Sequence, residues 1–562
     1  MPGGKRSFIC HGLAGMITIM SEEFSKTPDS KLLLPAIIVL GAALRMYRLG
    51  SESFWFDELY AVWANRLPVG GLVREHLASG HPPFYYLVMR GWFAISTDEV
   101  WIRSFSVMAG AATIWLVYLA GRELYSRQAG LWGAAFAALS PILVWYSRVA
   151  TFYSFMIALT TLSFYLLVRC SRRGGWLNWA GYTVAVTAVF FTYFYAGILL
   201  VAGVAVFLLL HERGLTARAR GERPFVPWLV NTGILALVAA GSFAASRQAI
   251  SEPTSRLHLP GAGELKGLIY AIAVAPFVLA VGPLDKALNY KGTEGAPKSH
   301  LLALFLVIAV LAAVIAVSAR VRRWFLKRET LAVCAAILIL VIGPLFLQLV
   351  NNGLLSGRFY AWAAPLLMLL AGAIVAALPG KVRAVAGGAV LAGLLALSAW
   401  TILGLPERDA DWRSLMGEVA RQQRDGDRML CFPQHNCVMA AGYYLPGGIQ
   451  IAGGMPSFTD GYVYFMPPGA GWTGYSSGYW AGTGVSPPVT GGELKSRLAQ
   501  DLAGAERVWL VSEPGLFQQY PDVGAALADG WRAAGSRAYG YFRLGLDGRR
   551  SCAPQCRPGR AG

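Results

Sequence analysis

Long apolar runs without a charged residue most constrain what this chain can fold into. Residues 301–319 and 331–350 contain no Asp, Glu, Lys or Arg. Each run holds roughly 20 residues, which is the length of helix that crosses about 30 Å of hydrocarbon. Composition agrees, since 55% of the 562 residues are hydrophobic and only 14% are charged. We therefore predict an all-α polytopic membrane protein.

The net charge of +18 is unevenly distributed along the chain. Residues 406–562 are nearly neutral, with 15 Lys and Arg against 14 Asp and Glu. The positive excess lies in short connectors of the apolar part, around residues 169–173, 213–223 and 320–328. Such clusters are typical of cytoplasmic loops under the positive-inside rule. A nucleic-acid-binding protein would instead carry a folded basic face, so we exclude this class.

With those connectors inside, the sequence predicts about eleven transmembrane helices after a cytoplasmic N-terminal segment, residues 1–31. The expected spans are 32–49, 101–121, 130–146, 152–168, 177–194, 196–210, 227–245, 301–319, 330–350, 359–378 and 384–404. Residues 83–96 are short, and residues 266–283 are interrupted by prolines. We expect both segments to be re-entrant or interfacial helices. The transmembrane domain then covers residues 32–405.

The C-terminal residues 406–562 are predicted to form a small α/β domain on the extracytoplasmic side. Four segments have suitable periodicity, namely a helix at 412–423 and strands at 428–432, 508–512 and 541–546. Residues 447–492 are rich in Gly, Tyr, Pro and Ser, which is typical of a loop. A Gly-x-Gly-x-x-Gly match within that loop lacks a preceding strand, so we do not interpret it as a nucleotide site.

Cysteine usage agrees with an extracytoplasmic tail. Four of the seven cysteines lie there, namely Cys431, Cys437, Cys552 and Cys556. Disulfides persist outside the cytoplasm, but the spacing does not determine the pairing. Zinc is the alternative, although these spacings differ from those of zinc fingers. We expect no bound metal and no other cofactor, with a divalent ion as the open alternative.

Two adjacent carboxylates, Asp57 and Glu58, stand in the predicted outer loop of residues 50–100. Burial against neighbouring aromatic residues would raise the pKa of such a carboxylate, which would allow it to act as a general base. The alternative is an ordinary acidic pair opening an interfacial helix, where negative charge suits the helix dipole. The two residues alone do not decide between these interpretations.

Cationic residues are predicted on the same outer face. They are Arg45, Arg48, His81, Arg103, Arg148 and Arg358. Arginine at an outer helix end goes against the positive-inside trend, so each needs either a lipid headgroup or an anionic partner. Several around one rim, facing an acidic pair, favour a pocket for a phosphate at the membrane surface. His81 also has a simpler interpretation, because His-Pro-Pro can merely change the direction of the chain at the membrane surface.

The order of short motifs from Arg45 onward resembles the bacterial GT-C glycosyltransferases of family 39, relatives of protein O-mannosyltransferases and the aminoarabinose lipid A transferase. The motifs are Leu-Arg-Met-Tyr-Arg-Leu-Gly at 44–50, Trp-Phe-Asp-Glu at 55–58, His-Pro-Pro-Phe-Tyr-Tyr at 81–86, Arg-Ser at 103–104, Leu-Ser-Pro at 139–141, Trp-Tyr-Ser at 145–147, Arg-Phe-Tyr at 358–360 with Pro365, and Asp-Trp-Arg at 411–413. Each motif is weak alone, but together they extend over most of the chain.

The resemblance implies an enzyme that transfers a sugar from a polyprenyl-phosphate donor outside the cytoplasm with inversion, as in modification of lipopolysaccharide or another cell-envelope glycan. Asp57 would deprotonate the acceptor hydroxyl and Glu58 would assist. The implied substrate-binding residues are His81, Arg103, Arg148, Arg358, Tyr85 and Arg48. The expected partners are the lipid-linked donor, a lipid or glycan acceptor and membrane lipids, with no nucleic acid. We expect the protein in the inner (cytoplasmic) membrane.

One segment departs from the family pattern. Many members carry Glu and Arg after the Trp-Tyr-Ser motif, whereas residues 148–153 here read Arg-Val-Ala-Thr-Phe-Tyr. A second carboxylate is therefore missing from that loop, which puts acceptor binding in doubt. A lipid or glycan transporter or flippase, a polysaccharide polymerase or ligase, and an inactive scaffold remain alternatives. A transporter would be expected to carry ionisable residues near mid-membrane.

Overall fold

The structure is a computed structural model that describes most of the helical part and much of the C-terminal part. The described residues are 31–78, 82–211, 225–249, 323–350, 358, 360–403, 411–432, 434–445, 448–453, 455–456, 463–464, 502–512, 531–539 and 542–549, with the single residues 268, 272, 279, 496 and 500. The chain divides into two compact units. Residues 1–49 and 80–405 form the helical unit, and residues 50–79 and 406–562 form the mixed unit.

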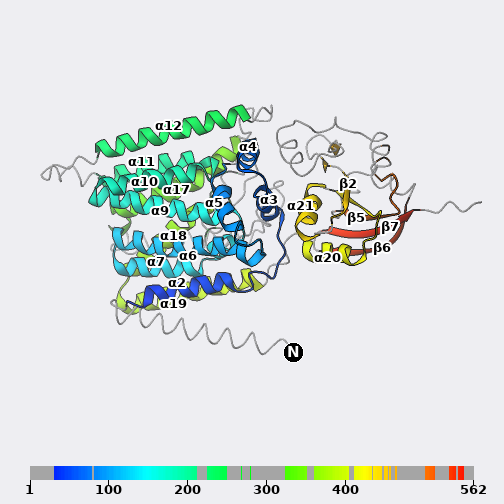
Figure 1. The fold of residues 1–562 in the computed structure, drawn as a ribbon. Coiled ribbons are helices and arrows are strands. Elements are labelled where there is room, and N and C mark those ends of the chain that lie inside the picture. Colours follow the sequence, from blue (N-terminus) through cyan, green and yellow to red (C-terminus); the bar gives the residue numbers. More distant parts are fainter. Residues whose placement is uncertain are drawn as a thin grey trace, which may run out of the picture. The chain divides into compact units, whose positions relative to one another are not determined.

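The helical unit consists of helices that lie alongside one another (Figure 1). They are α2 (Leu33–Met46), α5 (Phe84–Phe93), α6 (Glu99–Leu124), α7 (Arg127–Leu139), α8 (Pro141–Tyr146), α9 (Phe152–Arg173), α10 (Trp176–Phe190), α11 (Ile198–His211), α12 (Phe225–Ala249), α17 (Arg328–Val350), α18 (Ala364–Ala377) and α19 (Gly380–Leu403), with 3-10 turns η1 (Phe194–Gly197) and η4 (Ala361–Ala363).

Four segments among the described residues are long and apolar enough to cross a membrane: 99–124, 152–173, 328–347 and 380–402. Shorter apolar helices accompany them. The expected span 301–319 lies outside the described residues, and each of the others coincides with helical structure. The expected span 130–146 is divided at Ser140 into α7 and α8, and 359–378 begins with η4 before α18. The expected interfacial segment 83–96 contains the short helix α5, and residues 266–283 lie almost wholly outside the description. The prediction of a polytopic, mostly helical membrane protein is confirmed.

Glycines allow helices of this unit to approach closely. A Cβ atom placed on Gly372 of α18 would lie 2.3 Å from the backbone nitrogen of Gly133 on α7. One placed on Gly121 of α6 would lie 2.6 Å from the Cα atom of Gly130. Small residues at such contacts allow backbones to pack directly, which is how helices associate where lipid supplies no hydrophobic drive. The positions of α6, α7 and α18 therefore depend on the absence of side chains.

The predicted cytoplasmic residues Arg172 and Arg173 contact the ends of two other helices of the helical unit. Arg172 at the end of α9 donates to the carbonyl of Leu124 at 3.0 Å and contacts Glu329 of α17 at 3.5 Å. Arg173 pairs with Glu123 of α6 at 2.6 Å. These contacts bring the ends of α6 and α9 together with the start of α17.

The mixed unit contains a five-stranded sheet with the order β2-β1-β5-β7-β6. The strands are β1 (Arg428–Phe432), β2 (Gln450–Gly453), β5 (Arg507–Ser512), β6 (Trp531–Tyr539) and β7 (Phe542–Arg549); β3 (Met455–Pro456) pairs separately with β4 (Val463–Tyr464). Strand β1 runs parallel to β2 and β5, whereas β7 is antiparallel to β5 and β6. The unit's helices are α3 (Phe56–Ala64), α4 (Val69–Ala78), α20 (Trp412–Gln422) and α21 (Gln434–Tyr444).

The expected α/β character of the C-terminal part is confirmed, with differences in detail. The predicted helix at 412–423 and the predicted strands appear as α20, β1, β5 and β7. Strands β2, β3 and β4 lie within residues 447–492, so the prediction of an uninterrupted loop there was wrong. Backbone pairing with buried β1 stabilises β2 despite its poor composition. Strand β6 was not predicted, because Ala, Gly and Arg give it no alternating pattern.

Candidate functional site

The segment that carries Asp57 folds with the C-terminal residues, as part of the mixed unit. Its helix α3 packs against α21. The chain leading into α3 is also held, because the backbone N–H of Trp412 donates to the Ser53 hydroxyl at 3.1 Å. Arg413 donates to the carbonyls of Gly50 and Glu52, both at 3.1 Å. The Asp-Trp-Arg motif thus supports the entry to the predicted catalytic loop.

The two adjacent carboxylates differ in their surroundings. Glu58 is fully buried, and its Oε2 accepts a hydrogen bond from the backbone N–H of Trp55 at 3.2 Å. That contact closes a capping box at the start of α3, which satisfies a backbone donor that the helix leaves open. Asp57 lies in the same first turn and is partly exposed. Glu58 is therefore a structural cap, and Asp57 is the more accessible carboxylate.

A buried acidic residue on α4 was not anticipated from the sequence. Glu75 is 3% exposed and accepts a hydrogen bond from the Tyr60 hydroxyl at 3.5 Å. The ring of Tyr60 also meets that of buried His76 edge to face, with centroids 5.4 Å apart. Burial raises the pKa of Glu75 to about 7, against the opposing effect of the Tyr60 hydrogen bond. The only sequence signal was a Glu-His pair in a mildly amphipathic segment.

Three of the predicted outer arginines hold backbone carbonyl groups of the helical unit. Arg45 is 1% exposed and donates to the carbonyls of Ala138 at 2.8 Å and Ala137 at 3.1 Å. Arg103, also 1% exposed, donates to the Leu49 carbonyl at 3.0 Å. Arg148 donates to the carbonyls of Arg45 and Tyr47, at 2.8 and 2.5 Å. The bonds of Arg103 and Arg148 order the turn that follows α2, whereas those of Arg45 hold the end of α7.

Arg48 lies within that turn and has a different character. Its side chain is exposed. Its backbone has a positive φ of 52°, which no other non-glycine residue shows among the described residues. A left-handed backbone at an arginine is unfavourable and persists only where surrounding contacts hold it. The carbonyls flanking Arg48 are bound by Arg103 and Arg148, which supplies such contacts.

Tyr85 and the start of α5 form part of an aromatic cluster. Tyr85 is fully buried and its ring lies 6.1 Å from that of Phe105 and 6.2 Å from that of Phe155, measured between centroids. The backbone N–H of Phe84 donates to the Phe191 carbonyl at 2.8 Å, which places the start of α5 beside the end of α10. His81 lies outside the described residues, so its predicted role stays a prediction.

Arg358 lies near a second group of aromatic side chains. It is half-buried and within electrostatic reach of Tyr193. The ring of Tyr193 contacts Trp362 with centroids 5.2 Å apart and Phe152 with centroids 5.9 Å apart. Aromatic side chains of α9 and η4 therefore contact Tyr193, which is within electrostatic reach of Arg358. Arg358 is one of the residues predicted to bind phosphate.

The part of the chain that the structure describes contains no group of three or more His, Cys, Asp or Glu side chains placed to hold a metal ion. Cys431 and Cys437 instead form a disulfide. The expectation of a metal-free enzyme stays a prediction.

Comparisons with known proteins found a family model and several solved structures that are similar to this chain. Residues 80–241 match the family model described as dolichyl-phosphate-mannose-protein mannosyltransferase. The fold is similar to that of ArnT from Cupriavidus metallidurans bound to undecaprenyl phosphate, with a TM-score of 0.54 and 12% identity over 94% of this chain and 100% of that chain. The archaeal oligosaccharyltransferase AglB from Archaeoglobus fulgidus, in complex with an inhibitory peptide and a dolichol-phosphate, matches with a TM-score of 0.46 and 13% identity over 93% and 74% of the two chains. No curated protein sequence matches significantly.

Proposed function

We propose that this chain is a membrane glycosyltransferase of the GT-C superfamily, and that it transfers a sugar from a polyprenyl-phosphate donor to an acceptor hydroxyl on the outer face of the cytoplasmic membrane. The matching family model is named for a dolichyl-phosphate enzyme, and the ArnT structure with a similar fold contains undecaprenyl phosphate. Both compounds are lipid phosphates of the polyprenyl type, which supports a donor of that class.

The difference between Asp57 and Glu58 carries the assignment of the base. Glu58 is buried and accepts a hydrogen bond from the Trp55 backbone, so its oxygens belong to the local fold. Asp57 is partly exposed at the positively polarised start of α3, where a negative charge is favoured. An ionised and accessible carboxylate is the form that a general base requires. We assign Asp57 that role and assign Glu58 the role of shaping the turn.

The proposed reaction is one displacement with inversion. Asp57 accepts the proton of the acceptor hydroxyl while the acceptor oxygen attacks the anomeric carbon. The bond from that carbon to the phosphate oxygen breaks, and the lipid phosphate leaves with the bonding electron pair. Negative charge therefore grows on the leaving phosphate, and a fixed cation near it stabilises the transition state more than the ground state.

The contacts of the arginines divide the predicted phosphate ligands into two groups. Arg103 and Arg148 donate to backbone carbonyls of the turn after α2, which supports a role in holding that turn. Arg358 is half-buried and within electrostatic reach of Tyr193, and we propose that it meets the lipid phosphate. We propose Arg358, together with His81, as the phosphate-binding pair, and Arg48 and Tyr85 as residues that line the donor site.

A substitution of Asp57 tests this function. Asp57→Asn keeps the size of the side chain and removes the base, so we expect product formation to fall by at least about 100-fold. Wild type, Asp57→Asn and the control Glu52→Gln from the same segment are expressed equally in a deletion strain. Mass spectrometry then measures envelope glycolipids and glycans.

The proposal requires a hexose-sized or pentose-sized product that is present with wild type and Glu52→Gln and absent with Asp57→Asn. Accumulation of a polyprenyl-phosphate sugar in the deletion strain would identify the donor. A product profile that is the same in the deletion strain, the variant and the wild type would refute the assignment.

A further inference from the structure

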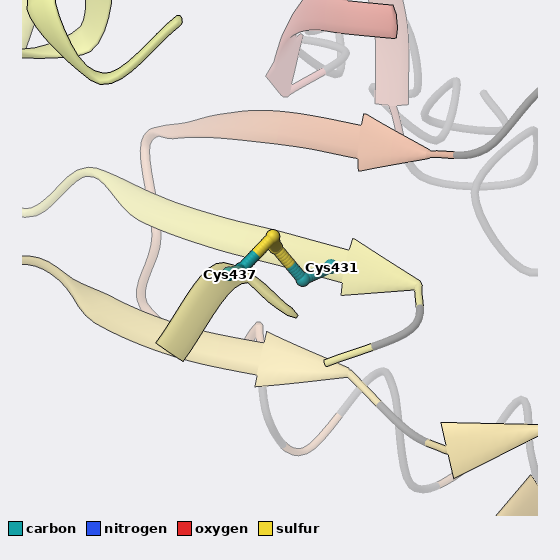
Figure 2. The surroundings of a disulfide bond; sticks show 2 residues. All are labelled: Cys431 and Cys437. Atoms are coloured by element: carbon teal, nitrogen blue, oxygen red, sulfur yellow. A yellow bond between two sulfur atoms is a disulfide. The ribbon is translucent and has the colours of Figure 1, made fainter. Parts of the chain in front are cut away.

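Helix α21 of the mixed unit is anchored near its start by a covalent bond. Cys437 in this helix forms a disulfide with Cys431 of β1, and Figure 2 shows the bond joining the helix to the strand. Both cysteines are fully buried. Strand β1 pairs with β2 on one side and β5 on the other, so it is an interior strand of the five-stranded sheet. The disulfide thus attaches the start of α21 to an interior strand of the sheet.

The last turn of α21 holds the chain on both sides of α3. Before α3, the backbone N–H of Phe54 donates to the Tyr444 hydroxyl at 2.7 Å. The buried ring of Phe54 also lies 5.1 Å from that of Tyr443, measured between centroids. After α3, the Arg66 side chain donates to the carbonyl of Gly442 at 3.0 Å. One turn of one helix therefore contacts both ends of the segment that carries Asp57.

The Tyr444 contact acts where the direction of α3 is set. Trp55 is the residue that precedes the first turn of α3, and Phe54 stands just before it. Phe54 is buried, so its backbone N–H needs a hydrogen-bond partner. A fixed N–H at this point fixes the entry of the chain into the helix, and with it the position of Asp57 in the first turn.

We propose that Tyr444 is a positioning residue for Asp57, and that the Cys431–Cys437 disulfide makes α21 rigid enough for Tyr444 to act. This inference rests on the proposed role of Asp57 as the base. Misplacement of a reacting group by about 1 Å can cost on the order of 100-fold in rate, so a contact three residues from the base is sufficient to control catalysis.

The test uses purified full-length protein in detergent, with a lipid extract of the deletion strain as the source of donor and acceptor. Tyr444→Phe removes the hydroxyl and keeps the ring. We expect the maximal rate to fall at least about tenfold, with the apparent KM for the extract unchanged within about twofold. Tyr118→Phe, in α6 of the helical unit, is the matched control and should retain the wild-type rate.

The disulfide is tested separately with the double variant Cys431→Ser/Cys437→Ser. We expect its maximal rate to fall in the same way, and hydrogen exchange at the amides of α3 to become faster in both this variant and Tyr444→Phe. The melting temperature of Tyr444→Phe, compared with that of Tyr118→Phe, shows whether the unit remains folded. Faster exchange confined to α3 in a folded protein is a result that general destabilisation would not produce.

Asp57→Asn in the same assay separates the two proposals. If it is as active as wild type, the proposed function itself fails. If it is inactive while Tyr444→Phe and the double cysteine variant keep the wild-type rate and exchange, the positioning role is overturned. A rise in apparent KM for Tyr444→Phe with an unchanged maximal rate would also overturn it, because Tyr444 would then act in binding.

Discussion

Arg45 is expected to be essential for the stability of the helical unit, in which its guanidinium donates to backbone carbonyl groups. Helix α7 ends at Leu139, and Pro141 opens α8. Because proline has no N–H, it cannot donate to the carbonyl of Ala137, four residues earlier. The guanidinium of Arg45 donates to that carbonyl at 3.1 Å and to the next, that of Ala138, at 2.8 Å. Arg45 therefore replaces a donor that the proline removed.

The magnitude follows from these contacts. Arg45→Met fills a similar space and removes these two hydrogen bonds, together with the one to the Gly41 carbonyl within α2. A buried carbonyl left without a partner costs about 1–3 kcal/mol, and the loss of the second bond adds about 1 kcal/mol. We expect the free energy of unfolding to fall by about 2–4 kcal/mol. The exposed Arg48 at the same helix end is the control, and Arg48→Met should change stability by no more than about 0.5 kcal/mol.

Reversible unfolding in mixed micelles of detergent and dodecyl sulfate, followed by circular dichroism, measures these differences. A double-mutant cycle with Pro141→Ala sharpens the test. An alanine restores the N–H and removes the restriction on Ser140, so the cost of Arg45→Met should be smaller in that background. Two results would refute the reasoning. One is equal stability of Arg45→Met and Arg48→Met. The other is a loss of stability from Arg45→Met that is the same with and without Pro141→Ala.

Two further predictions concern pH and packing. Because the folded protein raises the pKa of Glu75 from 4.5 to about 7, folding favours the protonated form. The stability of the mixed unit should then decrease as pH rises from about 4.5 to 7, by up to about 3 kcal/mol, and Glu75→Gln should flatten this dependence in thermal melts. Gly372→Ala should destabilise the helical unit by about 1–3 kcal/mol in micelle unfolding, since its methyl group would meet the backbone of Gly133; Gly380→Ala, with no atom within 4 Å, should not.

Local sequence was sufficient wherever neighbouring residues supply the cause. The apolar runs predicted the helices because hydrocarbon leaves a backbone no other way to satisfy its polar groups in a single segment. Trp-Phe-Asp-Glu predicted a functional loop, and the alternative of an acidic pair opening a helix also proved correct in part, because Glu58 caps α3. The structure thus assigns Glu58 to the helix start, and the catalytic role of Asp57 stays a prediction.

Contacts between residues that are far apart in the sequence could not be predicted from the sequence pattern. Arg45 and Ala138 are 93 positions apart, and the motifs at 44–50 and 139–141 looked independent until the structure showed one satisfying the backbone of the other. Likewise, Phe54 and Tyr444 are 390 positions apart. No periodicity marks such a pair, because hydrogen-bond geometry depends on how the helices pack.

The sequence by itself determined the class of molecule, since hydrophobic length, charge placement and short motifs are local properties. Tertiary structure alone decided which arginines hold carbonyls, which carboxylate is buried, and that residues 50–79 join the C-terminal residues in one unit. The physical reason is that a side chain acquires its partner, its burial and its pKa only when packing brings remote segments together and removes water from between them.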